Sequence, residues 1–298
     1  MDEYRIKDRK KRLEEEKARK RASSGAGEAG TKEKREERPA INQKTGGRKK
    51  KKKGGIFSTI ILVAAIVVFC FSGFQLFRIF YGYHKGDQEY DNLKEIGISA
   101  DAGTGEESTR YTVDFEELWK VNEDIIAWIR FDEPSIISYP VVQGKDNQEY
   151  LDKTISGYPN TYGAIFLNVS NNKDMMDKNS VIYGHRMNSK SMFGKLEEYQ
   201  DEEFYRSYPY FYIYTPDGKE LKYQIFAVGE VNDTSDAYQT VFENDEAFQS
   251  FLAFSKEHSF YDTGVEVPFD AKVVTLSTCT KANNEERLIV QGYQVEVN

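Results

Sequence analysis

The chain has 298 residues and a formal net charge of -8, from 41 Lys and Arg against 49 Asp and Glu. Residues 1–53 carry 21 basic and 10 acidic side chains, a net charge of +11, and the remainder carries -19. The remainder is too acidic for the broad basic surface that binds phosphates, so the composition argues against a nucleic-acid partner there. With 22 glycines and no glycine period, no sustained heptads and only two cysteines, collagen-like, coiled-coil and disulfide-scaffold classes are excluded.

The N-terminal segment, residues 1–55, is predicted to be a charged, disordered tail. It is nearly devoid of apolar side chains, so burial cannot offset the entropy lost on ordering it. It closes with the basic run RKKKKK at residues 48–53.

An uncharged apolar stretch follows at residues 56–77. Twenty-two helical residues span ~33 Å, enough to cross a bilayer core, so we predict a transmembrane helix over residues 56–80. The basic run precedes it, and only Arg78 and Lys85 follow, so the tail is expected in the cytoplasm and the rest outside the cell membrane, as a single-pass protein. The alternative is a cleaved signal peptide, which usually has a shorter apolar region and a small-residue cleavage site that is missing here.

The remaining chain is expected to divide into a polar extracellular stalk at residues 81–110 and a folded domain at residues 111–298. A short helix is predicted to begin the domain at Asp114, with Glu117 three residues later.

Eight segments in the domain are rich in β-branched and aromatic residues and are predicted strands. Their short connections favour a mostly antiparallel β-barrel over alternating strands and helices. The segments are residues 125–131, 136–142, 163–169, 180–185, 211–215, 221–231, 272–279 and 287–297.

One amphipathic helix is predicted between two strands, at residues 244–258, where Phe248, Phe251 and Leu252 recur at helical spacing. Two interpretations stay open. The helix either packs on the barrel or forms a wall or lid of a substrate groove.

Cys279 is the one cysteine of the predicted outer domain, because Cys70 lies inside the apolar span. Without an intramolecular partner it is either a buried apolar residue or a reactive thiol. It ends a predicted strand just before a polar loop, a position where active groups are presented, and this favours a nucleophile.

A nucleophilic thiolate needs a nearby base or cation. His185 is the favoured partner, because it ends a predicted strand after Gly184, which lets the backbone turn sharply. His84 is expected at the membrane interface, and His258 at a helix end where an imidazolium complements the helix dipole.

Arg287 begins the next predicted strand eight residues after Cys279, so a hairpin would bring both to one loop. There a guanidinium can stabilise an oxyanion. The alternative for Arg287 is a surface charge that pairs with Glu285 or Glu286. No metal-binding, P-loop or dinucleotide motif is found, so no metal or cofactor is expected.

These residues resemble a known family. TLSTC at residues 275–279 resembles the TLxTC signature of sortases, the membrane-anchored cysteine transpeptidases of Gram-positive bacteria. The resemblance to the class B branch extends through NEDIIAW at 122–128, YPVVQGKDNQEYL at 139–151, GAIFL at 163–167, YGHRM at 183–187 and MFGKL at 192–196.

The resemblance implies an eight-stranded antiparallel barrel with an N-terminal helix and the inserted helix. It also implies Cys279 as nucleophile, His185 as general acid and base, and Arg287 as oxyanion stabiliser. The residues that it implies for the substrate groove are Ser277, Asn147 and Leu151.

By this resemblance the chain cleaves a C-terminal sorting motif of secreted proteins. It then transfers the acyl group to an amine of a peptidoglycan precursor or cross-bridge, or to a lysine of a pilin. A surface cysteine protease with water as acceptor and a non-catalytic, membrane-tethered binding domain are the alternatives.

Overall fold

The structure, a computed structural model, describes residues 55–101, 110–134, 137–279 and 285–298. The chain divides into two compact units, Met1–Thr59 and Ile60–Asn298. The first contributes only the start of one helix to the described residues, and the predicted tail, residues 1–54, lies outside them.

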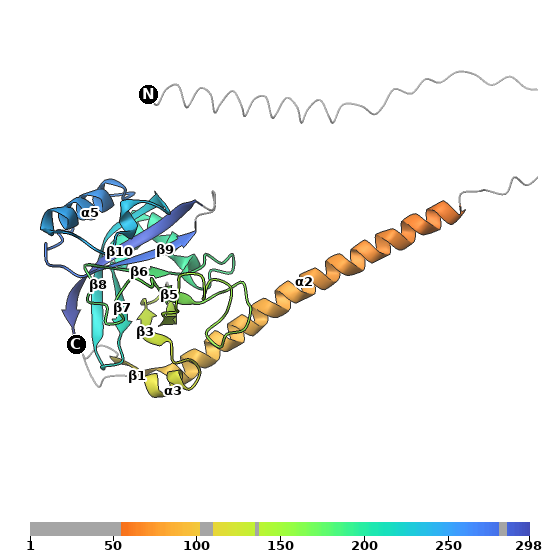
Figure 1. The fold of residues 1–298 in the computed structure, drawn as a ribbon, viewed down its shortest axis with the longest axis horizontal. Coiled ribbons are helices and arrows are strands. Elements are labelled where there is room, and N and C mark those ends of the chain that lie inside the picture. The colour runs from red at the N-terminus through yellow and green to blue at the C-terminus, as the bar shows by residue number, and fades with distance from the viewer. Residues whose placement is uncertain (1–54, 102–109, 135–136, 280–284) are drawn as a thin grey trace, which may run out of the picture. The chain divides into compact units, whose positions relative to one another are not determined.

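A closed β-barrel forms the centre of the second unit (Figure 1). Its eight strands follow the order β10-β8-β7-β3-β4-β5-β6-β9 around the barrel. The strands are β3 (Ile125–Arg130), β4 (Ser138–Val142), β5 (Ile165–Leu167), β6 (Asn179–Tyr183), β7 (Tyr210–Tyr214), β8 (Glu220–Asn232), β9 (Val273–Cys279) and β10 (Glu286–Val297).

The predicted mostly-β barrel is thereby confirmed, and every strand end lies within two residues of its predicted position. Six of the eight strand pairings are antiparallel, and the pairs β4 with β5 and β6 with β9 are parallel. Parallel neighbours need a long crossover connection, which residues 143–164 supply between β4 and β5.

Strand alternation separates the barrel interior from its outer face. Leu276 of β9 and Leu288 of β10 belong to the main core. Ile289, one residue on, instead packs with Val231 and Ala237 in a separate cluster. Positions 277, 287 and 289 therefore lie on the outer face of the barrel.

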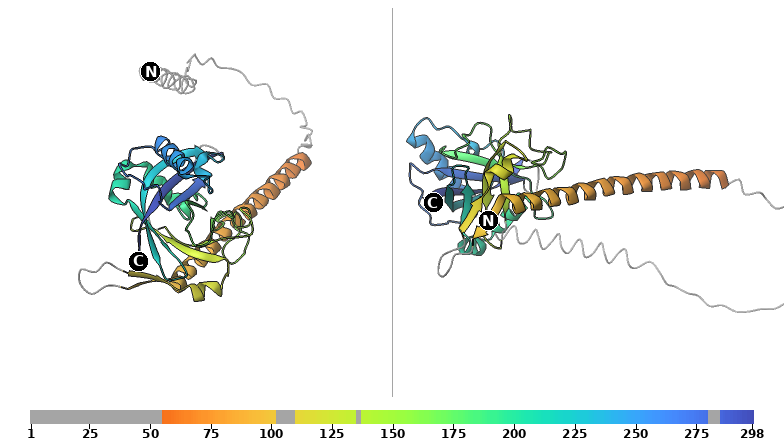
Figure 2. Two further views of the ribbon diagram at one scale, coloured as in Figure 1. Left: turned by 60° about the vertical axis from the view of Figure 1, so that its left-hand side comes forward. Right: turned by 90° about the horizontal axis from the view of Figure 1, so that it is seen from below.

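The predicted inserted helix is α5 (Asp245–Glu257). It begins at Asn244, whose side chain accepts a hydrogen bond from the Ala247 N–H at 2.8 Å. It lies on the outside of the barrel (Figures 1 and 2). Its apolar side, with Phe248 and Phe251, packs against Phe226 of β8.

The N-terminal helix α2 (Gly55–Gly97) is longer than the predicted membrane span. It includes residues 81–97 of the predicted stalk. Tyr83, Gly86, Tyr90, Leu93 and Gly97 recur at spacings of three and four and share one helix face.

That face of α2 packs against the barrel. Tyr90 and Leu93 are buried, and the Tyr90 hydroxyl donates to the Gly163 carbonyl at 2.6 Å. Burial of this face explains why the helix continues beyond the apolar stretch.

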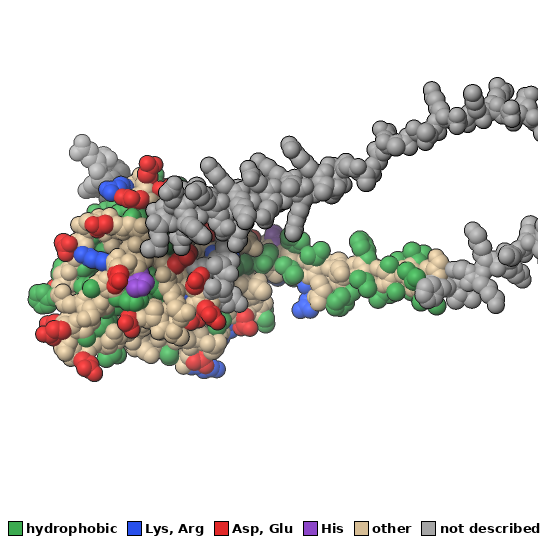
Figure 3. All heavy atoms as spheres, turned by 90° about the horizontal axis from the view of Figure 1, so that it is seen from above, with side chains coloured by type: hydrophobic (Ala, Val, Ile, Leu, Met, Phe, Trp, Pro, Cys, Tyr) green, Lys and Arg blue, Asp and Glu red, His purple; other side chains and the backbone are tan. Residues whose placement is uncertain are grey.

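α2 is also long and apolar enough to cross a membrane, and hydrophobic side chains cover much of its surface (Figure 3). It is therefore a candidate membrane anchor. The barrel surface in the same view carries many acidic side chains.

The predicted helix at Asp114 is α3 (Phe115–Trp119), and the Asp114 carboxylate accepts from the Glu117 N–H at 3.0 Å. Other short elements have no counterpart among the predictions. They are the antiparallel pair β1 (Ile98–Asp101) and β2 (Arg110–Val113), the 3-10 helices η1 (Phe193–Gln200) and η2 (Asp236–Tyr238), and α4 (Glu202–Ser207).

Candidate active site

Three neighbouring strands, β6, β9 and β10, position the three residues predicted for catalysis: Cys279 and Arg287 lie on β9 and β10, and His185 follows the end of β6 by two residues. Arg287 of β10 pairs directly with Cys279, the last residue of β9. On the other side of β9, Tyr183 of β6 pairs with Ser277, and the Gly184 N–H donates to the Ser277 carbonyl at 3.1 Å. The backbone therefore brings positions 185, 279 and 287 to the same end of the barrel.

A pocket of about 230 Å³ lies at this end. Five of the six predicted site residues line it, and the sixth, Cys279, directly follows the lining residue Thr278; the Cys279 side chain lies outside what the structure describes. The lining residues are Asn147, Gln148, Leu151, Phe166, Tyr183, Gly184, His185, Asp233, Tyr238, Ser277, Thr278 and Arg287.

Strand alternation places this site outside the barrel interior. Position 279 is two residues beyond Ser277 and opposite Arg287, so all three positions share the outer face of the sheet. The connection from β8 to β9 covers this face, and its Asp233 and Tyr238 line the pocket. The pocket thus lies between the sheet and this connection.

His185 is held by the loop that precedes β5. Its Nε2 lies 2.5 Å from the Leu151 carbonyl oxygen, and because a carbonyl only accepts, this contact requires the proton on Nε2. Gly163 permits the close approach. Its φ is +57°, and a Cβ there would lie 2.5 Å from the Leu151 oxygen and 2.8 Å from His185 Cδ2.

The other two histidines lie away from the pocket lining. His84 is exposed on α2. His258 ends α5, where its Nδ1 lies 2.9 Å from the Phe254 carbonyl and its ring stacks on the Phe254 ring. This agrees with the structural role expected for His258.

Arg287 is partly buried, and its guanidinium Nη2 lies 3.1 Å from the Asp233 Oδ2. Asp233 is thus a carboxylate partner in addition to the Glu285 and Glu286 side chains that the sequence offers, and Nη1 donates to the Glu286 main-chain carbonyl at 3.3 Å. Asp233 directly follows β8 and is far from Arg287 in sequence, so a local sequence pattern cannot predict this ion pair.

Ser277 contacts a residue that the sequence did not single out. The hydroxyls of Ser277 and Tyr238 lie 2.8 Å apart, and the Tyr238 ring stacks on Tyr183 at 6.1 Å between centroids. Burial raises the pKa of the Tyr238 phenol well above its usual value, so the hydroxyl keeps its proton even in alkaline solution. Ser277 is 1 % exposed and lines the pocket together with Tyr238.

The opposite wall comes from the loop after β4. The Asn147 side-chain oxygen accepts from the Val169 N–H at 2.8 Å, which ties this loop to the segment after β5.

Within the described part of the chain, the hydroxyl of Thr278 is buried and has no hydrogen-bond partner. It is a polar group at the pocket immediately before Cys279.

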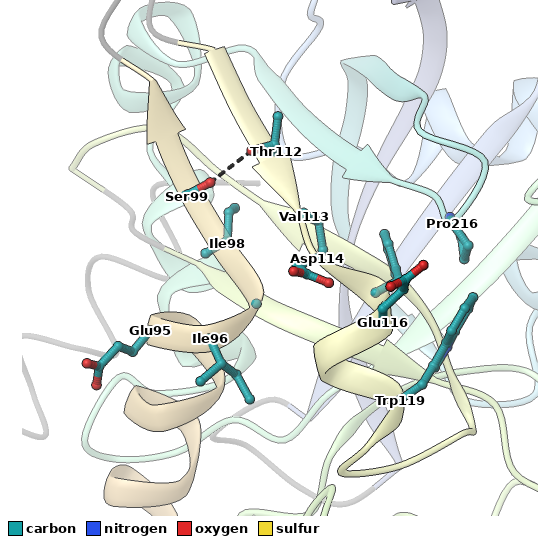
Figure 4. A pocket seen from close by; sticks show the side chains of 12 residues that line it. Glu95, Ile96, Ile98, Ser99, Thr112, Val113, Asp114, Glu116, Trp119 and Pro216 are labelled. Atoms are coloured by element: carbon teal, nitrogen blue, oxygen red, sulfur yellow. Dashed lines mark hydrogen bonds between the residues drawn. The ribbon is translucent and has the colours of Figure 1, made fainter.

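A larger hollow, of about 720 Å³, lies elsewhere, between the end of α2, β1, β2 and α3 (Figure 4). Three of its polar side chains take part in hydrogen bonds of the fold itself. The hydroxyls of Ser99 and Thr112 bond at 2.8 Å, and Asp114 caps α3. It contains no histidine or cysteine, so the smaller pocket is the better candidate for catalysis.

No cluster of three or more His, Cys, Asp or Glu side chains suited to a metal ion occurs in the ranges that the structure describes. The pocket itself offers an imidazole, a guanidinium and a neighbouring cysteine position at the end of a strand.

The sortase domain model matches residues 132–295. The chain belongs to the sortase family. Sortase B of Listeria monocytogenes is 32% identical over 229 residues, 76% of this chain and 91% of that protein. The class B resemblance is confirmed, and the chain is a sortase-type cysteine transpeptidase.

Solved sortase B structures share the fold. The Bacillus anthracis enzyme in complex with AAEK1 is 31% identical with a TM-score of 0.63, over 73% of this chain and all of that one. A Staphylococcus aureus sortase B–substrate complex is 31% identical with a TM-score of 0.57, over 61% of this chain and 84% of that one. A sortase B complexed with triglycine is 30% identical with a TM-score of 0.57, over 61% and 85% of the two chains.

Proposed function

We propose that this sortase cleaves a C-terminal sorting motif of secreted proteins and transfers the new acyl end to an amine of a peptidoglycan precursor or cross-bridge. The alternative acceptor is a lysine of a pilin. The substrate and triglycine complexes of related sortase B enzymes support a sorting peptide as acyl donor and an amine as acceptor.

In the first half-reaction the Cys279 thiolate attacks the carbonyl carbon of the scissile amide. Arg287 donates hydrogen bonds to the oxyanion that forms. His185 gives its proton to the departing nitrogen, the C–N bond breaks, and a thioester on Cys279 remains.

In the second half-reaction the acceptor amine attacks the thioester carbonyl. His185 takes the proton from the attacking nitrogen, the C–S bond breaks, and the Cys279 thiolate is restored. The energy of the first amide bond is thus kept in the thioester until a new amide forms. Water as acceptor would instead give hydrolysis.

The pocket walls are assigned to the sorting peptide. Asn147, Leu151 and Ser277 line the space next to position 279, where the residues before the scissile bond would lie. Tyr238 orients the Ser277 hydroxyl, which is bonded to it.

The membrane arrangement is part of the proposal. α2 would cross the cell membrane once, with the basic run at residues 48–53 in the cytoplasm and the barrel outside. The pocket would then lie on the outer side of the membrane. Secreted proteins emerge on that side, and wall precursors are attached to the membrane there.

One observation carries the catalytic assignment. Arg287 pairs with Cys279 across β9 and β10, and His185 lies at the same pocket, two residues after the end of β6 on the other side of β9. The register of these strands therefore supports a joint catalytic role for a guanidinium, an imidazole and a cysteine.

The test is to trap the thioester. The enzyme is incubated with candidate sorting peptides, and its intact mass is measured before and after addition of oligoglycine, a diaminopimelate-type amine or a lysine peptide. We expect a mass increase on the wild-type enzyme, none on the Cys279→Ala variant, and release as an amide with the correct amine.

Two results would contradict the proposal. Peptide cleavage by Cys279→Ala at the wild-type rate would remove Cys279 from the reaction. Release only as a free acid, whatever amine is added, would identify a protease.

A further inference from the structure

A groove of about 580 Å³ lies where α2 leaves the predicted membrane span. One wall is a single face of α2, and the other is the loop of residues 156–160 between β4 and β5. The lining residues are Phe77, Arg78, Tyr81, Gly82, Lys85, Gln88, Glu89, Asn92, Ser156, Tyr158, Pro159 and Asn160.

Two hydrogen bonds hold the walls together. The Asn160 side-chain amide donates to the Gly82 carbonyl at 2.9 Å, and the Ser156 N–H donates to the Glu89 carboxylate at 2.8 Å. The groove is therefore built by contacts between helix and loop.

The charges in the groove are ordered along the helix. At ~1.5 Å per residue, Arg78 lies ~1.5 Å beyond Phe77, the last residue of the apolar stretch, whereas Lys85 lies ~12 Å and Glu89 ~18 Å beyond it. The headgroup layer beside the hydrocarbon core is ~5 to 8 Å thick, and long basic side chains reach back toward it. With α2 crossing the membrane as proposed, Arg78 starts at headgroup level and the long Lys85 side chain can reach back to it, whereas the Glu89 carboxylate lies beyond it.

Aromatic side chains flank the cations. Tyr81 is 52 % exposed on α2, and Tyr158 is 69 % exposed on the loop. Tyrosines gather at membrane interfaces, where the ring meets apolar groups and the hydroxyl meets water. A loop that rests on the membrane surface would put the exposed Tyr158 ring at such an interface.

We propose that this juxtamembrane groove binds the phosphate of an anionic membrane lipid and so seats the barrel on the outer leaflet. The inference goes beyond the transfer reaction and rests on the membrane orientation in the proposed function. Because α2 remains helical to Gly97 and packs on the barrel, lipid bound here would restrain the whole catalytic domain. One to two cations at a membrane surface give about a 5- to 30-fold preference for anionic lipid.

The test uses the full chain in nanodiscs of phosphatidylcholine, with and without phosphatidylglycerol. Association of spin-labelled lipids measures the preference, and hydrogen exchange of residues 154–160 reports on the loop. We expect a preference of about 5- to 30-fold for phosphatidylglycerol and slower exchange of the loop in its presence. The double variant Arg78→Gln and Lys85→Gln should lose both effects.

The matched control removes two other basic side chains, Lys195→Gln and Arg206→Gln, which lie outside the groove lining and should keep both effects. Equal association of the two lipids, or a groove variant that behaves as wild type, would overturn the inference. Slower loop exchange on addition of inorganic phosphate to phosphatidylcholine nanodiscs would also overturn it, because the ligand would then be soluble phosphate.

Cleavage of a soluble sorting peptide is measured on the same samples. Lost lipid preference with normal cleavage would count against the groove alone. Kept preference without cleavage by the wild-type enzyme would count against the proposed function alone. Failure of the chain to enter nanodiscs would contradict the membrane span on which the groove depends.

Discussion

Arg287 and Asp233 form an ion pair, with Nη2 and Oδ2 3.1 Å apart, although 54 residues separate them in sequence. They meet because β8 and β10 are neighbours and Arg287 pairs with Val231, two residues before Asp233. The Asp233 N–H donates to the Glu285 carbonyl at 2.9 Å, which fixes the backbone that carries the carboxylate. Asp233, at the start of the connection between β8 and β9, thereby holds the Arg287 guanidinium through this ion pair.

Asp233 is therefore expected to position Arg287 for the oxyanion. Replacement by Ala should lower kcat for peptide transfer by about 10-fold with little change in KM, because misplacement of a catalytic donor affects the transition state more than substrate binding. The measurement is steady-state kinetics with a sorting peptide and a saturating amine.

Two further variants separate positioning from folding. Asp233→Glu keeps the charge and should recover part of kcat, whereas Asp233→Asn should resemble Ala. A purely structural role would lower the thermal midpoint of all three variants without changing kcat of the folded enzyme.

Arg287→Lys should lower kcat/KM by roughly 100- to 1,000-fold, the usual cost of losing an oxyanion donor. An ammonium keeps the charge but not the planar pair of donors. The pairing with Asp233 should survive in part, so the thermal midpoint should change little. Near-normal turnover of this variant would show that Arg287 only pairs with Asp233.

Much of the fold was accessible from the sequence, because its signals are local. Strand segments such as residues 221–231 show β-branched and aromatic side chains between turn residues, and α5 shows apolar residues at helical spacing after Asn244. Position 279 was singled out by cysteine count and by its place at a strand end.

What the sequence did not reveal depends on tertiary contacts. Asp233 and Tyr238 reach the pocket only because the β8–β9 connection folds over the outer face of the sheet. The helical state of residues 81–97 was obscured because their polar side chains match a linker, and only the barrel gives Tyr90 and Leu93 something to pack against.

Tyr238→Phe should lower kcat/KM by roughly 5- to 10-fold, the equivalent of one hydrogen bond. The variant removes the hydroxyl that bonds Ser277 and keeps the ring stacked on Tyr183. Ser277→Ala should have a similar effect. If the two hydroxyls act as one unit, the double variant should be no worse than either single variant, and strictly additive losses would contradict this.

Gly86→Ala tests the docking of α2 on the barrel. A Cβ at Gly86 would overlap the Tyr162 ring, whose hydroxyl donates to Asp87 at 2.7 Å. We expect a loss of about 1 to 3 kcal/mol in the free energy of unfolding. Gly82→Ala on the same helix meets nothing within 4 Å and should gain about 0.5 to 1 kcal/mol. Chemical denaturation in detergent measures both, and equal effects would contradict this packing.

Alkaline pH should destabilise the domain through its buried tyrosines. Burial raises the pKa of Tyr223 and of Tyr238 well above the ordinary value of about 10. Below about pH 10 the phenols keep their protons in both the folded and the unfolded protein, so their full contribution to the free energy of unfolding is present. As the pH rises above about 10, the unfolded state loses protons that the folded state keeps, so stability falls by up to about 1.4 kcal/mol per pH unit for each such tyrosine. Denaturant unfolding at increasing pH measures the slope. The Tyr223 hydroxyl is buried without a partner among the described residues. Tyr223→Phe should therefore make the pH slope of the free energy of unfolding smaller, by the equivalent of about one proton. An unchanged slope would show that Tyr223 ionises normally in the folded domain.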